Sequence, residues 1–76
     1  MTNQEMTQAT LDNWKSNHRQ QIKGVPMDWL TRQAQACASL TRLEMQTLMD
    51  SGMSESEAWA EARSLFCMAK PPKYDH

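Results

Sequence analysis

The stretch Ser51-Gly52-Met53-Ser54-Glu55-Ser56-Glu57 decides the fold, because it has the pattern of one helix ending, a tight turn and a second helix beginning. Gly52 has no Cβ, so it readily adopts the left-handed backbone angles that close a helix. Ser54 and Glu57 have the spacing of a capping box, in which the hydroxyl and the carboxylate each accept a hydrogen bond from a free backbone N–H. The stretch therefore predicts an αα-hairpin that turns at Gly52.

The composition around this turn favours helices throughout. The chain has 76 residues, only two glycines, and Ile22 and Val25 as its only Ile and Val. Strand-rich chains need many turns and many β-branched residues, so an all-α fold follows. A chain of this length forms one domain with a small core, which a second subunit often supplements.

Three helices are expected along the chain. Thr2 and Glu5 have capping-box spacing, and Thr10 offers a later helix start. Because residues 1–9 are polar, fraying is expected to about residue 7, with the first helix running from there to residue 23. Pro26 breaks the chain and begins a long central helix that ends at about residue 51. The third helix runs from Ser54 to the residue before Pro71.

The domain organisation follows from these elements. Residues 1–9 are polar and are expected to be partly disordered, and residues 10–70 form a single helical domain. Residues 71–76 are expected to be a flexible tail, because two prolines end the last helix. The tail contains a PPxY pattern of the kind that WW domains bind, but the prolines already have a structural role as a helix stop.

The long central helix has apolar residues on two nearly opposite arcs at about 100° per residue. The larger arc contains Met27, Leu30, Ala34, Cys37, Ala38, Met45, Leu48 and Met49. The smaller arc contains Trp29, Ala36, Leu40 and Leu43. Either the first and third helices cover opposite sides of this helix, or one arc pairs with a second subunit, and both explanations remain open at this point.

Charge divides the chain into two halves. Residues 13–43 carry five cations and one anion, a net charge of +4, whereas residues 44–69 carry five anions and one cation, a net charge of −4. Such a distribution suits antiparallel self-association or an oppositely charged partner.

Two features suggest nucleic-acid binding as an alternative. The hairpin at Gly52 has the outline of a helix-turn-helix, and Lys15, Arg19 and Lys23 form a basic stripe on the first helix. However, the third helix begins with Glu55 and Glu57, whose carboxylates would repel phosphates at the position of a recognition helix. A helix-turn-helix transcriptional regulator is therefore the second interpretation.

The sequence gives little sign of catalysis. Cys37 and Cys67 lie at the same distance from Gly52, but Cys67 is expected to point away from the apolar stripe of its helix, so two buried free thiols are expected and pairing stays open. No cluster has metal-ligand spacing, no glycine loop suits a phosphate, and no nucleophile has a visible base, so neither cofactor, metal nor enzymatic activity is expected.

A polar N-terminus and the lack of an apolar run of about 20 residues predict a cytoplasmic protein without a membrane span.

These observations favour a small non-enzymatic protein-binding module, an accessory, regulatory or inhibitory protein that occupies the surface of a partner protein and is able to form a homodimer. The compact, cofactor-free, methionine-rich chain is typical of phage and plasmid products. The residues expected to contact the partner are Trp14, Lys15, Arg19, Lys23, Trp29, Leu40 and Leu43.

Overall fold

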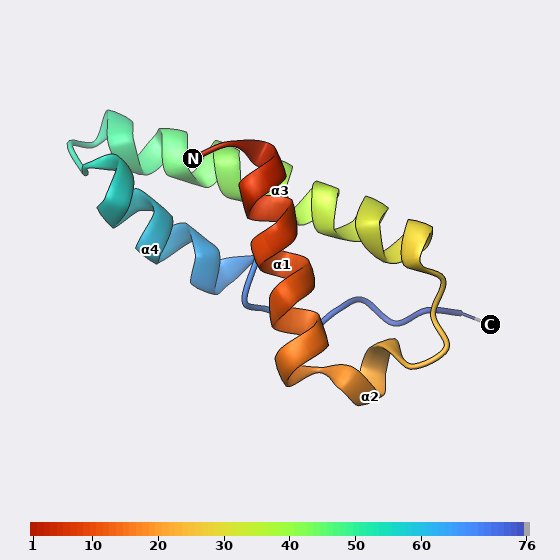
Figure 1. Ribbon diagram of the computed structural model, residues 1–76. Coiled ribbons are helices and arrows are strands. Elements are labelled where there is room, and N and C mark those ends of the chain that lie inside the picture. Colours follow the sequence, from red (N-terminus) through yellow and green to blue (C-terminus); the bar gives the residue numbers. More distant parts are fainter. Residues whose placement is uncertain (76) are drawn as a thin grey trace.

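The computed structural model describes residues 1–75 as a small all-α domain, which confirms the expected fold class. The elements are α1 (Asn3–Asn17), α2 (Arg19–Ile22), α3 (Met27–Asp50) and α4 (Glu55–Leu65). In Figure 1, α4 folds back along α3, α1 crosses α3, and the C-terminal segment passes the end of α1 and returns towards the beginning of α3. The molecule is elongated, with principal extents of 43 × 19 × 18 Å.

The turn between α3 and α4 has the predicted chemistry. Gly52 has a φ of +107°, and the N–H groups of Gly52 and Met53 donate to the carbonyls of Met49 and Leu48 at 3.0 and 3.1 Å. These two bonds form a Schellman motif, which satisfies carbonyls that the end of α3 leaves free. Ser54 and Glu57 then form the capping box that begins α4, so the expected αα-hairpin is confirmed.

The first helix differs from its expected course at both ends. A second capping box, between Thr2 and Glu5, begins α1 at Asn3, and Met6 is fully buried, so the helix starts well before the expected position. The expected helix start near residue 7 is therefore wrong, because α1 begins at Asn3 and Met6 in its first turn is buried. The helix also breaks at His18, where α2 turns the chain back towards α3 (Figure 1).

The core consists of two clusters along α3. The first cluster contains Met6, Ala38, Met45, Ala58, Ala62 and Cys67, with Leu48 and Trp59 packed against it. The second contains Leu11, Trp14, Leu30 and Ala34, with Ile22, Val25, Trp29 and Cys37 packed against it. Because α1 contributes to both clusters, it joins the α3–α4 hairpin to the N-terminal part of α3.

The last helix ends at Leu65, earlier than expected, and the chain then turns beneath α1. The side chains of Asn13 and Trp14 donate to the carbonyls of Cys67 and Ala69 at 3.3 and 3.0 Å, so backbone groups outside the helix are satisfied by α1. Cys67 lies in the core and does not point away from it, because the helix has already ended at this position.

The C-terminal segment lies against the domain as far as it is described. Pro71 is buried, and the Tyr74 ring packs edge-on against Trp29 with ring centroids 4.9 Å apart. Within the expected flexible tail, Pro71 is therefore buried and Tyr74 contacts Trp29, and His76 lies outside the described residues. Two residues of the PPxY pattern, Pro71 and Tyr74, take part in these contacts.

Candidate interaction surface

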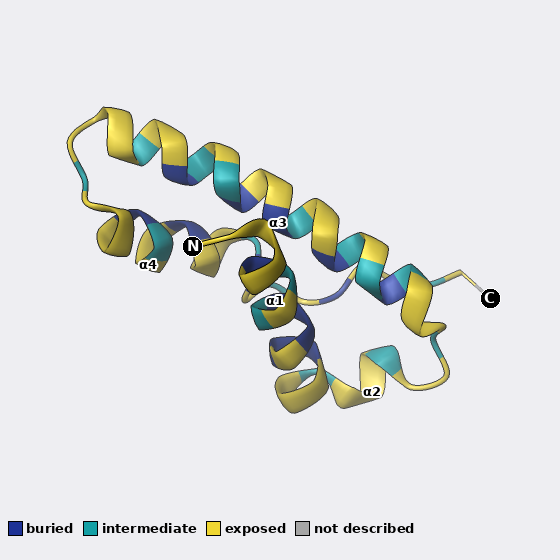
Figure 2. Cartoon of the chain, turned by 45° about the horizontal axis from the view of Figure 1, so that its top comes forward, coloured by how far each residue is buried: buried dark blue, intermediate teal, exposed yellow. Residues whose placement is uncertain are grey.

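The central helix is buried on one arc only. Its buried residues are Leu30, Ala34, Ala38, Thr41 and Met45, all from one side of the helix. On the other side, Leu40 and Leu43 have exposed fractions of 48% and 66%, and Ala36 and Thr47 are also exposed. We call Ala36, Leu40, Leu43 and Thr47 the outer face of α3, and Figure 2 shows exposed residues along this helix away from the contacts with α1 and α4.

This arrangement tests one of the two explanations for the apolar arcs. Both α1 and α4 pack on the larger arc, so the idea that helices of the same chain cover opposite sides of α3 is wrong at the level of Leu40 and Leu43. Leucines with this exposure are left in contact with water at an unfavourable free energy that a partner would remove. The other explanation, in which the smaller arc pairs with a second subunit, stays a prediction.

The two tryptophans expected to bind a partner both contact other parts of the same chain. Trp14 is only 1% exposed and its indole N–H donates to Ala69, so it is a core residue and its placement on a binding surface is corrected. Trp29 is half-buried between the second core cluster and Tyr74. The contact between Trp29 and Tyr74 could not be predicted from local sequence patterns, because the two residues are more than 40 positions apart along the chain.

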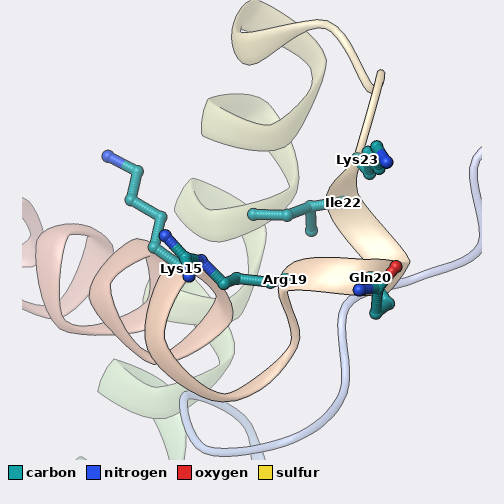
Figure 3. A pocket seen from close by; sticks show the side chains of 5 residues that line it. All are labelled: Lys15, Arg19, Gln20, Ile22 and Lys23. Carbon is teal, nitrogen blue, oxygen red and sulfur yellow. The ribbon is translucent and has the colours of Figure 1, made fainter.

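The basic residues of the expected surface come together in one pocket. Lys15, Arg19 and Lys23, with Gln20 and Ile22, line a pocket of about 550 Å³, which we call the basic pocket (Figure 3). All three cations are exposed. The helix break at His18 does not separate them, because α2 stays beside the end of α1. The basic pocket and the outer face of α3 are lined by different residues and so form two separate candidate surfaces.

The hairpin keeps the charge pattern that opposes DNA recognition. Glu55 and Glu57 are exposed in the first turn of α4, and Glu55 accepts a hydrogen bond from the N-terminal ammonium of Met1. The basic pocket lies near α2, at the other end of the molecule from the α3–α4 turn (Figure 1). A recognition helix at α4 would therefore present carboxylates to the phosphates.

The described residues offer few groups for covalent or metal chemistry. Both cysteines are free, and burial, followed by the nearby Cys67, raises the pKa of the Cys37 thiol above its ordinary value. A raised pKa lowers the population of the thiolate, which is the nucleophilic form. Among residues 1–75, no three His, Cys, Asp or Glu residues are grouped so as to hold a metal ion. No helix in this part of the chain has the length and apolar character that crossing a bilayer requires.

No family model matches this chain, and no curated protein or solved structure is detectably similar to it.

Proposed function

We propose that this protein is a small non-enzymatic binding module, an accessory, regulatory or inhibitory protein, that docks another protein on the outer face of α3. One observation carries the proposal: Leu40 and Leu43 lie one turn apart and are exposed on a helix whose opposite side is buried. Complete burial of a fully exposed leucine contributes about 1.5–3 kcal/mol, and these two side chains, 48% and 66% exposed, would each contribute about half of that.

The spacing on this face fits helix-mediated recognition. Ala36, Leu40 and Leu43 occupy positions i, i+4 and i+7, the spacing with which helices present apolar anchors to a partner. The small side chains of Ala36 and Thr47 on either side of the leucines let a partner backbone approach α3 closely.

A second candidate function is supported by the basic pocket. Its lining contains three cations and no acidic residue, which favours an anionic ligand such as an acidic protein segment. The phosphates of a nucleic acid share this chemistry, and the helix-turn-helix regulator remains the alternative function. The acidic first turn of α4 argues against that alternative, because the N-terminal end of a recognition helix at α4 would carry negative charge where it meets the DNA phosphates.

The proposal is tested by affinity capture from the native host with the immobilised chain. We expect Leu43→Glu to abolish capture of the partner while helicity, measured by circular dichroism, stays unchanged. Leu65→Glu is the matched control, because Leu65 is 58% exposed but belongs to α4. Retention of the same partner by the Leu43→Glu protein would contradict the use of the outer face.

The same experiment separates the two surfaces. A variant with Lys15, Arg19 and Lys23 replaced by Gln removes the charge of the basic pocket and leaves the leucines in place. Capture that is lost in this variant and also falls with added salt would assign binding to the pocket, since exposed charge interactions are screened by salt.

A further inference from the structure

We propose that the occupant of the outer face of α3 is a second copy of this chain, docked antiparallel about a two-fold axis that passes between Leu40 and Leu43. This inference rests on the proposed function, because it takes the outer face to be a binding surface and names the partner. Three properties of the chain support it.

The first property is self-complementarity. A two-fold axis between Leu40 and Leu43 places each leucine beside the other leucine of the second copy, and places Ala36 at the level of the second copy's Thr47. Each large side chain thus meets a large one at the centre, with small residues above and below. A two-fold interface uses the same patch on both subunits, so this symmetric arrangement of sizes is what such an interface requires.

The second property is the position of two charged residues at the edge of the face. Arg32 and Asp50 are 18 residues apart, which is about five turns at 3.6 residues per turn, so they lie on the same side of α3. Arg32 lies eight residues before Leu40 and Asp50 lies seven residues after Leu43. The two-fold axis therefore brings Arg32 within about 1.5 Å, along the helix axis, of the level of Asp50 in the second copy.

Both residues are available for this pairing. Arg32 and Asp50 are exposed, and within residues 1–75 neither of them forms an ion pair. The carboxylate of Asp50 accepts one hydrogen bond, from Gln46 at 3.0 Å, which leaves acceptor positions free. In an antiparallel helix pair the same edges of the two helices face each other, so the dimer contains the Arg32–Asp50 contact twice.

The third property is the charge of the whole chain. Residues 13–43 carry a net charge of +4 and residues 44–69 a net charge of −4, and the molecule is 43 Å long. An antiparallel arrangement places the basic half of each copy beside the acidic half of the other, whereas a parallel arrangement opposes like charges. The charge distribution therefore sets the antiparallel orientation of the two copies, and burial of the two leucines drives their association.

The test uses the purified full chain and measures molar mass by analytical ultracentrifugation over a hundredfold range of concentration. We expect the mass to rise from one chain to two, since a face of this size gives a weak, reversible dimer. Leu43→Glu should remain a monomer at every concentration with unchanged helicity, and the control Leu65→Glu should dimerise as the native chain does.

Charge exchange tests the orientation. Arg32→Glu alone and Asp50→Arg alone each turn two attractive contacts into repulsive ones and should weaken association about tenfold. The double variant with both substitutions restores the contacts with reversed sign, so it should dimerise like the native chain. Failure of this double variant to recover association would overturn the antiparallel register.

Other outcomes separate this inference from the function on which it rests. A chain that stays monomeric over the whole range overturns the homodimer. If that monomer nevertheless captures a different protein, and Leu43→Glu removes the capture, the outer face is a binding surface for another partner and the proposed function stands. A dimer that tolerates Leu43→Glu overturns the use of this face for self-association.

Discussion

At the residue scale, the two capping boxes are the best-defined chemistry in the molecule. Thr2 with Glu5, and Ser54 with Glu57, each form both reciprocal hydrogen bonds. The backbone and side-chain hydrogen bonds with Thr2 hold the pKa of Glu5 below its ordinary value, and those with Ser54 do the same for Glu57. Both helix starts that frame the first core cluster therefore depend on an ionised carboxylate.

These pKa shifts predict loss of stability in acid. A carboxyl with a lowered pKa in the folded state stabilises the fold above its unfolded pKa, near 4.5, and loses this contribution as pH falls through the folded value. We expect the free energy of unfolding, measured by urea denaturation from neutral pH downwards, to decrease less steeply for Glu5→Gln/Glu57→Gln. Glutamine keeps the acceptor oxygen but does not titrate. If the free energy of unfolding falls with pH at the same slope in the native chain and in the double variant, the capping boxes do not cause the loss of stability in acid.

At the element scale, the accuracy of the sequence predictions depends on whether the determinants are local. The hairpin at Gly52 is predictable because the glycine, the serine and the glutamate that form it lie within six residues. The break at His18 is not predictable in this way, since it accompanies the crossing of α1 over α3. The early end of α4 is not predictable either, because Asn13 and Trp14 donate hydrogen bonds to carbonyls that are distant along the chain. Local patterns carry no information on such contacts.

The C-terminal segment provides a prediction at this scale. Because the Tyr74 ring packs edge-on against Trp29, Tyr74→Ala should lower the free energy of unfolding by about 1 kcal/mol and shift tryptophan emission to longer wavelength. Lys73→Ala is the control, since Lys73 is the exposed neighbour in the same segment. Denaturation curves and emission spectra that do not distinguish the two variants would mean that the segment contributes nothing to the fold.

At the scale of the whole molecule, the sequence shows two apolar arcs on α3 but not which of them is covered. The exposed Leu40 and Leu43 and the clustered cations were all identified as candidate contacts from their spacing. Trp14, which was also expected to contact a partner, is instead buried in the second cluster. Only the packing of α1 and the tail distinguishes a core tryptophan from a surface leucine, and that packing arises from contacts between residues far apart in the chain.

The joining role of α1 leads to a prediction about the fold as a whole. Met6 is fully buried in the first cluster, while Leu11 and Trp14 of the same helix lie in the second. Met6→Ala should therefore lower the free energy of unfolding by about 2–5 kcal/mol, the usual range for a buried methionine, which is a large share of the stability of a domain this small. Urea denaturation measures the loss, and both clusters should unfold in one transition.

Met49→Ala is the matched control for this prediction. Met49 is 38% exposed on α3, so its substitution should change the free energy of unfolding by no more than about 0.5 kcal/mol. Similar losses for the two methionines would show that burial by α1 is not what stabilises the domain. Separate transitions for the two clusters in the Met6→Ala protein would show that α1 does not couple them, because the α3–α4 hairpin would then unfold independently of the N-terminal part of α3.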